Sequence, residues 1–228
     1  MFVKLLNYTQ EPEKTVALAG RLCYSPKNIE ETQNGLDRDY IAKMVNMLRD
    51  SGHLSTFEHV SFTFGIEGVS RALTHQLVRH RLASYSQQSQ RYVKEKQFEY
   101  IIPDSIKKAG IEDRFKERMA TIQEWYNEAM ELGIPAEDAR FYLPNASETK
   151  IIVTMNAREL LHFFEHRCCN RAQWEIRAMA DEMIKLAKEK APYIFENSGP
   201  PCVKKECPEG KMSCGKIKEM REKYRSVK

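Results

Sequence analysis

The stretch from Arg79 to Tyr92 constrains the fold of this chain more than any other. Its fourteen residues include three arginines, one histidine and eight side chains that carry a hydroxyl or an amide. A helix or strand that faces a hydrophobic core cannot bury so many polar groups, because each group left without a partner costs several kcal/mol. The stretch is therefore either a solvated surface loop or the lining of a polar pocket for an anionic, hydrogen-bonding ligand.

The composition is that of a folded protein with a real core. Of the 228 residues 42% are hydrophobic, and lysine plus arginine exceed aspartate plus glutamate by 36 to 32. The net charge of +4 is too small for a protein that coats nucleic acid. No apolar run is long enough to cross a bilayer, so we expect a cytoplasmic protein without a membrane partner. Without a secretory signal, the six cysteines are expected to be reduced thiols.

Hydrophobic periodicity predicts several elements before this stretch. Ile41, Met44, Val45 and Leu48 recur at helical spacing, whereas the residues from Ser61 onward alternate as in a half-buried strand. The predicted elements are a strand at 2–8, a helix around 16–23, a helix at 37–49, a strand at 61–67 ended by Gly68, and a helix at 71–80 that Ser70 caps.

Downstream, the polar residues from Ser84 to Gln90 have neither period and predict an ordered loop, and the tail after Pro192 is expected to be loop-like. These features favour a single helix-rich α+β domain around a small antiparallel sheet. The predicted elements are a strand at 98–102, a long helix from about 115 to 132, a short helix after Pro135, a strand at 149–155, a helix opened by an Asn156–Glu159 capping box, and an apolar helical stripe from 172 to 187.

Arginines are the side chains most suggestive of a ligand. The guanidinium presents a planar fork of donors that suits phosphates and the carbonyl edges of heterocycles. Exposed ion pairs add little to stability, so stability is a weak reason to place arginines beside apolar stripes, although each could still have an ordinary paired role. The six that do so are Arg79, Arg81, Arg91, Arg140, Arg158 and Arg167.

Other familiar sites are not indicated by the sequence. There is no glycine-rich dinucleotide fingerprint, no P-loop and no G-x-S-x-G elbow. His53, Glu58 and His59 fit no zinc template, and the tail cysteines Cys202, Cys207 and Cys214 lack C-x2-C spacing, so we predict no metal site.

Arg79-His80-Arg81 followed after seven residues by Ser89 resembles the signature R-H-R-x7-S of the flavin-dependent thymidylate synthases. Three further segments resemble that family in the same order and together cover about residues 40 to 190. They are His53-x-Ser55-x-Phe57-Glu58-His59, Asn156-Ala157-Arg158 and Ala172-Gln173-Trp174-Glu175-Ile176. The resemblance implies reductive methylation of dUMP to dTMP, with methylenetetrahydrofolate as carbon donor and NADPH-reduced FAD as hydride donor. It also implies a homotetramer with shared active sites and a helix-rich α+β fold.

The resemblance assigns residues to two sides of a site. On the flavin side these are Ser55, Arg79, His80, Arg81, Gln87, Asn156, Arg158 and His162. On the nucleotide side they are Gln76, Arg79, Gln87, Gln88, Ser89, Gln90, Arg91, Arg140 and Arg167. In the family, the arginine that matches Arg167 lies against the pyrimidine ring and favours its N3-ionised form, so Arg167 is assigned to catalysis.

The residue chemistry agrees with these assignments. A nucleotide monophosphate brings close to two negative charges and a ring of alternating donors and acceptors, which arginine, glutamine and serine complement. Ser89 is assigned to substrate binding and not to nucleophilic attack, because no base is assigned beside it. Many family members carry Asn and Glu where this chain has Ser86 and Gln87, so an amide replaces a charged contact there.

Since no linker or repeat precedes the tail, we expect a catalytic flavin- and dUMP-binding domain at residues 1–197 and a Cys- and Lys-rich tail at 198–228 that is not a separate domain. Two alternatives remain at this stage. One is a nucleic-acid-binding module in which the stretch from Arg79 to Tyr92 contacts phosphates and stacks on bases. The other is a metal-binding regulator built on the tail cysteines.

Overall fold

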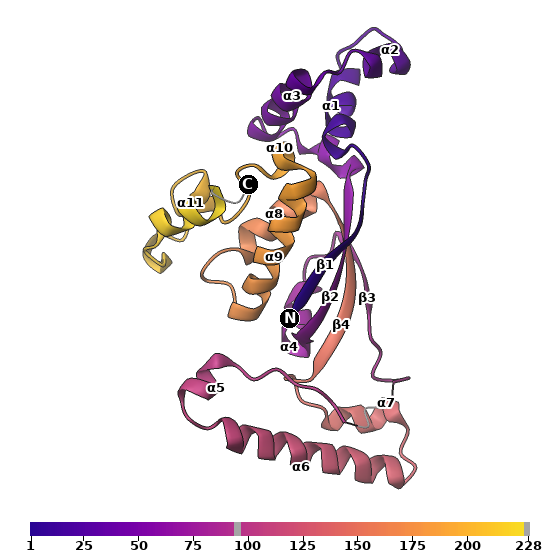
Figure 1. Ribbon diagram of the computed structural model, residues 1–228, viewed down its shortest axis with the longest axis vertical. Helices are drawn as coiled ribbons and strands as arrows, with labels where there is room; N and C mark the ends of the chain where they lie inside the picture. Colours follow the sequence, from indigo (N-terminus) through magenta and orange to yellow (C-terminus); the bar gives the residue numbers. More distant parts are fainter. Residues whose placement is uncertain (94–96, 226–228) are drawn as a thin grey trace. The chain divides into compact units, whose positions relative to one another are not determined.

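Four strands form one sheet in the order β1-β2-β4-β3, as Figure 1 shows for a computed structural model that describes residues 1–93 and 97–225. Thr63 Oγ1 lies 2.9 Å from Thr154 Oγ1, and the Arg71 amide donates to the carbonyl of Ser147, so the register of β2 against β4 is antiparallel. The antiparallel sheet confirms the predicted α+β class. The strands are β1 (Phe2–Tyr8), β2 (Ser61–Ser70), β3 (Ala83–Gln87) and β4 (Glu148–Asn156).

Alternation explains why β2 and β4 carry the core. In β2 the aromatic and aliphatic side chains fall on every second residue, and those of Phe62, Phe64 and Ile66 are almost fully buried. In β4 the same spacing buries Ile151 and Val153. Each of these buried side chains removes apolar surface from water, which stabilises the fold by about 25 cal/mol per Å².

The chain divides into two compact units, each described here by itself. Unit 1 comprises Met1–Phe2, Ile66–Arg79 and Tyr85–Ile152, and unit 2 comprises Val3–Gly65, His80–Ser84 and Val153–Lys228.

Unit 2 holds the larger set of helices. Leu160, Phe163 and Phe164 on α8 are buried, and α9 runs beside α8 in Figure 1. The α1 and α3 helices also pack on each other. The helices and 3-10 helices of unit 2 are α1 (Pro12–Leu22), α2 (Ile29–Asn34), α3 (Arg38–Asp50), η1 (Leu54–His59), α8 (Ala157–Arg167), α9 (Trp174–Lys190), α10 (Pro192–Phe195), η3 (Pro201–Val203), η4 (Gly210–Met212) and α11 (Ile217–Arg225).

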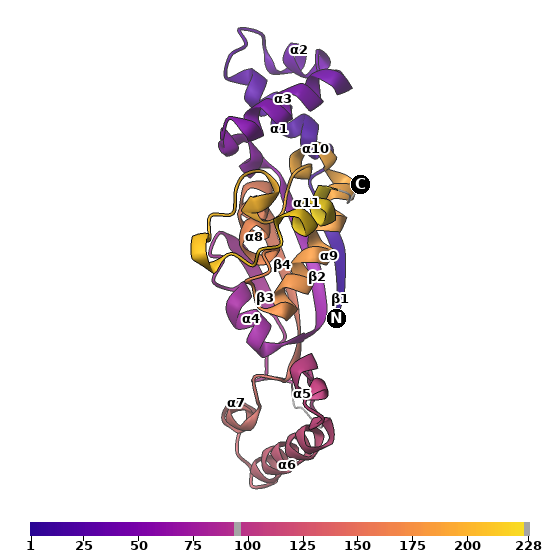
Figure 2. The ribbon, with the colours of Figure 1, turned by 90° about the vertical axis from the view of Figure 1, so that its left-hand side faces the viewer.

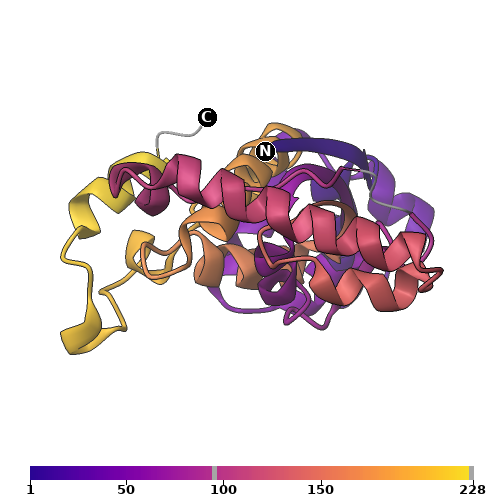
Figure 3. The same ribbon diagram turned by 90° about the horizontal axis from the view of Figure 1, so that it is seen from below.

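Unit 1 is built around one long helix. Figure 3 shows α6 with α7 alongside it, and Tyr126 and Ala129 of α6 pack on Ala139 of α7 in a small core of their own. The predicted long helix is therefore confirmed. The helices of this unit are α4 (Arg71–Leu77), α5 (Asp104–Lys108), α6 (Glu112–Glu131), α7 (Ala136–Ala139) and the 3-10 helix η2 (Arg140–Tyr142).

The prediction of a loop-like tail is only partly right for the residues that the structure describes, because α10, η3, η4 and α11 interrupt its irregular segments. In Figure 2 the tail ends in α11 beside α9. Met220 and Tyr224 of α11 are buried, the Tyr224 hydroxyl donates to the Cys168 carbonyl at 2.9 Å, and Lys188 of α9 donates to the Tyr224 carbonyl. The high lysine content misled the prediction, because α11 needs only two apolar residues at helical spacing to anchor it. Residues 226–228 lie outside the described residues.

Three other expectations need correction. Residues Ala83–Gln87 form β3 and not a loop, because an outer strand can expose alternate polar side chains while its backbone pairs with β4. The strand expected at 98–102 is reduced to an isolated antiparallel bridge between Tyr100 and Ser147. The helix that begins after Ser70 ends at Leu77, three residues earlier than expected.

Gly68 does not end its strand as predicted. It lies inside β2 with φ +69, and a Cβ there would come within 3.0 Å of the Met1 backbone nitrogen. Glycine therefore allows both the left-handed conformation and the close approach of β1. Among the residues that the structure describes, no helix combines the length and the apolar character that a membrane span requires.

Candidate functional site

In unit 2, Glu159, His80 and Arg167 form a row of side chains joined by hydrogen bonds. Asn156 caps α8, its side chain accepting from the Glu159 amide at 2.8 Å, and this cap fixes the first turn on which Glu159 sits. The Glu159 carboxylate turns inward and lies 3.0 Å from His80 Nδ1. On the other side of the imidazole, Arg167 Nε donates to His80 Nε2 at 3.0 Å. The structure thus joins the two predicted residues His80 and Arg167 directly.

Burial controls the electrostatics of this row. His80 is 5% exposed and Glu159 is equally buried. Desolvation by burial is the main reason why the pKa of His80 lies below its ordinary value of 6.5, and the Arg167 cation lowers it further. Glu159 opposes both effects through its hydrogen bond and its charge. The imidazole is therefore neutral near pH 7.

His162, another predicted flavin contact, adjoins the same carboxylate. Its Nδ1 lies 3.3 Å from Glu159 Oε1, and its ring is 5.6 Å from that of His80. His80, Glu159 and His162 form the one group of three potential metal ligands with all ligand atoms within 4.8 Å, as far as the described part of the chain goes. His162 is half exposed, so the row reaches the surface of unit 2 through it.

The remaining flavin-side residues of unit 2 are exposed. Arg158, at the start of α8, pairs with Glu58 of η1. Ser55 lies on the same 3-10 helix, and Arg81 is exposed immediately before β3. Unit 2 therefore carries exposed hydroxyl and guanidinium donors. The Asn156 side chain, in contrast, is already hydrogen-bonded as the cap of α8.

In unit 1, Gln87 has a defined structural environment. Its amide nitrogen donates to the hydroxyl of Thr74 at 3.0 Å and to that of Thr149 at 3.2 Å. Gln88 is held through its backbone, because its N–H donates to the Lys150 carbonyl. The Gln87 side chain is thus hydrogen-bonded to unit 1 itself, and its predicted contact with flavin and nucleotide stays a prediction.

The other nucleotide-side residues of unit 1 lie on α4, just before and after β3, and at the start of η2. Ser89 Oγ accepts from the Arg91 amide at 3.2 Å, which makes Ser89 part of a turn. The Arg91 guanidinium makes two hydrogen bonds to one Glu137 oxygen, at 2.9 and 2.7 Å, and this partner raises the Arg91 pKa. Arg140 Nε donates to the Glu137 carbonyl at 2.9 Å. Glu137 therefore brings Arg91 and Arg140 together within unit 1. Gln76 is half-buried, Arg79 is exposed, and Gln90 is half-buried.

Sequence reasoning missed the carboxylates that hold the predicted donors. Glu58, Glu137 and Glu159 each bind a residue that the sequence had assigned to the site. The spacing of Asn156 and Glu159 was a usable signal, but it suggested a capping box. Only the cap from Asn156 is present as predicted, because the Glu159 side chain points to His80 instead.

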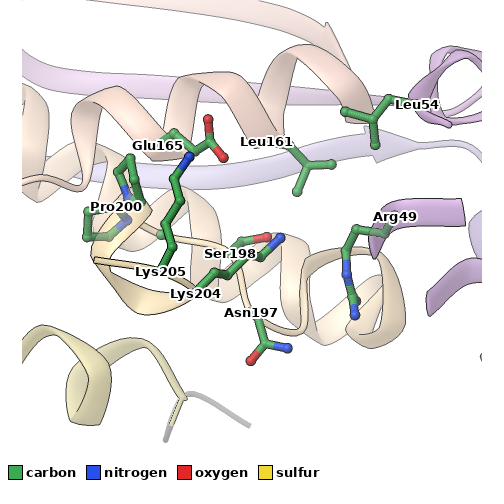
Figure 4. Close-up of a pocket in the computed structure, with 11 residues that line it drawn as sticks. Arg49, Leu54, Leu161, Glu165, Asn197, Ser198, Pro200, Lys204 and Lys205 are labelled. Carbon is green, nitrogen blue, oxygen red and sulfur yellow. The ribbon is translucent and has the colours of Figure 1, made fainter. Parts of the chain in front are cut away.

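A cavity of about 180 Å³ in unit 2 lies outside the predicted site (Figure 4). The cations that line it are matched by carboxylates: Arg49 bonds Asp50 and Glu196, and the Lys205 ammonium points toward Glu165 in Figure 4. Its lining residues are Arg49, Leu54, Leu161, Glu165, Asn197, Ser198, Gly199, Pro200, Pro201, Lys204 and Lys205.

Two of the tail cysteines lie near Cys169. Cys169, Cys202 and Cys207 line a cavity of about 300 Å³, and burial, followed by the neighbouring thiols, raises the pKa of Cys202. A raised pKa keeps Cys202 in the thiol form, which is a weaker metal ligand than the thiolate.

Comparison with known proteins identifies the family. The model of the thymidylate synthase complementing protein family, Thy1, matches residues 4–193. A flavin-dependent thymidylate synthase from Clostridium tetani is 54% identical over 97% of this chain and 96% of its own length. Relatives with the same name from Geobacter sulfurreducens (52% identity, 100% and 99% coverage) and Pyrococcus abyssi (44% identity, 97% and 96% coverage) extend the match. These relatives give no support to the nucleic-acid-binding alternative. From the long family match and the identity to these relatives, we conclude that this chain belongs to the Thy1 family of flavin-dependent thymidylate synthases.

Proposed function

We propose that this chain is an FAD-dependent thymidylate synthase, which converts dUMP to dTMP with methylenetetrahydrofolate as carbon donor and NADPH as reductant. The observation that carries the proposal is the full-length similarity to relatives named flavin-dependent thymidylate synthase, at up to 54% identity. The signature residues Arg79, His80, Arg81 and Ser89 lie inside that matched region.

The donors of unit 2 fit an FAD molecule. Arg81 and Arg158 present guanidinium groups suited to a diphosphate, and Ser55 and His162 can hydrogen-bond its polar edges. Bound FAD supplies the hydride transfer. The protein side of the reaction is positioning: these side chains hold and orient the cofactor, and an anion would compete with Glu58 for the Arg158 guanidinium.

The donors of unit 1 fit the nucleotide. Arg91 and Arg140, gathered by Glu137, are suited to the phosphate, whereas Gln87, Gln88, Ser89 and Gln90 offer amides and a hydroxyl to the sugar and base. Gln76 and Arg79 complete this proposed set.

The proposed role of Arg167 in catalysis depends on its positive charge. A guanidinium against the pyrimidine would stabilise the N3-ionised ring, and the contact with neutral His80 leaves the charge of Arg167 undiminished. Because Arg167 Nε is held by a buried acceptor, the orientation of the guanidinium is set before the substrate arrives.

The proposed assembly is a homotetramer with shared active sites, acting in the cytoplasm. We assign catalysis to residues 1–197 and treat 198–228 as a tail of the same domain, which the packing of Tyr224 against α9 supports. Analytical ultracentrifugation would measure the assembly directly; a sedimenting species of one or two chains would contradict the tetramer.

The first experiment is an absorbance spectrum of the purified protein and an assay of NADPH oxidation with and without dUMP. We expect flavin absorbance, oxidation that responds to dUMP, and dTMP formation that requires methylenetetrahydrofolate. A colourless protein that neither binds FAD nor converts dUMP would refute the function. Arg167→Ala should lower kcat by roughly a hundredfold or more with a smaller change in dUMP affinity. Arg171→Ala, which removes an arginine that pairs with Glu209 instead, is the matched control.

A further inference from the structure

The feature that the proposed function leaves unexplained is the buried carboxylate of Glu159. A buried ionised carboxylate is costly unless hydrogen bonds compensate it, and the partners of Glu159 Oε1 are the imidazoles of His80 and His162. Its position on the first turn of α8 is already secured by the Asn156 cap, which needs only the Glu159 backbone. The carboxylate itself therefore has another role.

The hydrogen-bond directions in the row determine the tautomer of His80. Arg167 Nε can only donate, so His80 Nε2 must accept and cannot carry a proton. In a neutral imidazole the proton then lies on Nδ1, and the atom 3.0 Å from Nδ1 is the acceptor Glu159 Oε1. Both hydrogen bonds run the same way, from Arg167 through His80 to Glu159.

Loss of the carboxylate would free the imidazole to move its proton. With the proton on Nε2, two N–H groups would face each other where Arg167 Nε and His80 Nε2 are now 3.0 Å apart, and the guanidinium would have to turn away. The charged and titratable groups that act on His80 include Glu159, Arg167 and His162, and the rings of Phe163 and His166 lie 4.9 and 6.4 Å from its own ring.

We propose that Glu159 is a positioning residue for Arg167, acting through the tautomer of His80. The proposal rests on the proposed function, in which Arg167 contacts the pyrimidine of dUMP. Glu159 contacts neither substrate nor cofactor; it keeps His80 Nε2 unprotonated, so that Arg167 Nε has an acceptor and the rest of the guanidinium keeps one orientation.

The same three ligand atoms could instead suggest a metal ion, because His80, Glu159 and His162 place them within 4.8 Å. A cation at His80 Nδ1 would have to replace the proton that Glu159 accepts. It would also lie one imidazole away from the Arg167 cation. The space between His80 Nδ1 and Glu159 Oε1 therefore suits a proton better than a divalent metal ion.

The test compares Glu159→Leu, Glu159→Gln and the control Glu165→Gln, a change of an exposed glutamate on the same helix. We expect Glu159→Leu to lower kcat by roughly ten- to a hundredfold, with the KM for dUMP and the FAD content changed less than about threefold. Glu159→Gln should recover part of the loss, because its amide oxygen can still accept from His80 Nδ1. A loss of FAD content or a change in KM alone, with kcat kept, would overturn the proposal.

A second background separates positioning from simple destabilisation. In His80→Gln, the amide oxygen can accept from Arg167 without any tautomer to select, so adding Glu159→Leu should then cost less than about threefold in kcat. An equal cost in both backgrounds would mean that Glu159 acts only by stabilising the fold.

A readout that does not depend on turnover is nitrogen NMR of protein labelled at the histidine imidazoles, with the His80 signal assigned by its absence in His80→Gln. We expect a neutral His80 protonated at Nδ1 in the native protein and a mixture of tautomers in Glu159→Leu. Protonation at Nε2 in the native protein would overturn the proposal even if dUMP is converted, and absence of conversion with the expected tautomers would instead refute the proposed function. Stoichiometric binding of zinc that is lost in Glu159→Gln would also overturn it.

Discussion

At the scale of single residues, this protein keeps its donors in place with carboxylates. Arg91 is held by Glu137 and Arg158 by Glu58, and each of these pairs is about half exposed. Such pairs contribute little to the free energy of unfolding, but they hold the guanidinium in one orientation. An anionic ligand can then replace the carboxylate at low cost.

Arg91→Ala should weaken dUMP binding by roughly tenfold or more, because the proposed phosphate contact disappears. Glu137→Gln should keep or strengthen binding, since Arg91 then has no ionic competitor. Isothermal titration of both variants with dUMP measures the difference. Unchanged affinity in Arg91→Ala would place the phosphate elsewhere.

His80 makes the stability of the protein depend on pH. The pKa of His80 is lowered in the folded state by burial and by Arg167. At a pH above its unfolded pKa near 6.5, His80 is neutral in both states and does not reduce the free energy of unfolding. As the pH falls below 6.5, His80 is protonated in the unfolded chain but stays neutral in the folded chain, so the free energy of unfolding decreases. Urea midpoints at pH 7.5 and 5.5 should therefore differ more in the native protein than in His80→Gln, with the exposed His75→Gln as control. Equal differences would mean that His80 is protonated as easily in the fold as outside it.

At the scale of secondary-structure elements, caps decide where the helices of the site begin. Ser70, Asp37 and Asn156 each accept a hydrogen bond from the backbone of the first turn that follows, as their sequence positions predicted for Ser70 and Asn156. The cap of α8 matters most here, because Arg158, Glu159, His162 and Arg167 all lie on that helix.

Asn156→Ala should lower the free energy of unfolding by about 1 kcal/mol, within a usual range of about 0.5–2. Asn156→Asp keeps an acceptor at the cap and should retain most of the stability, which separates the cap from any flavin contact of the amide. Urea unfolding followed by circular dichroism gives both values. An alanine variant as stable as the native protein would show that α8 is held by packing alone.

At the scale of the whole molecule, the tail is part of the folded structure of unit 2. Tyr224 is 1% exposed, its hydroxyl donates to the Cys168 carbonyl, and the buried Lys188 ammonium donates to the Tyr224 carbonyl. Burial lowers the pKa of Lys188, and the Tyr224 carbonyl is one of the groups that stabilise its charge, together with Glu196.

Truncation after Asn197 should therefore lower the melting temperature, because it exposes the surface under α11 and removes the carbonyl that Lys188 binds. Tyr224→Phe keeps the ring and should cost about 1–3 kcal/mol through the lost hydroxyl alone. Differential scanning calorimetry of both variants tests the two contributions. A truncated protein that melts with the native one would mean that the tail adds nothing to the fold.

The sequence by itself determined the elements whose patterns are local. Alternation in β2 and β4, the long helix α6 and the caps of α4 and α8 could all be predicted, because each depends on side chains a few residues apart. The signature around Arg79 to Ser89 determined the family for the same reason, since its residues are close together in the chain.

Only the tertiary structure decided which residues meet. The strand at 83–87 forms because β4 offers it a partner, although its own sequence has no strand pattern. The contact of His80 with Glu159 joins residues 79 positions apart, and that of Arg167 with His80 joins residues 87 apart. Hydrophobic periodicity cannot predict such contacts, because they depend on how the helices pack. The role proposed for Glu159 therefore required the tertiary structure.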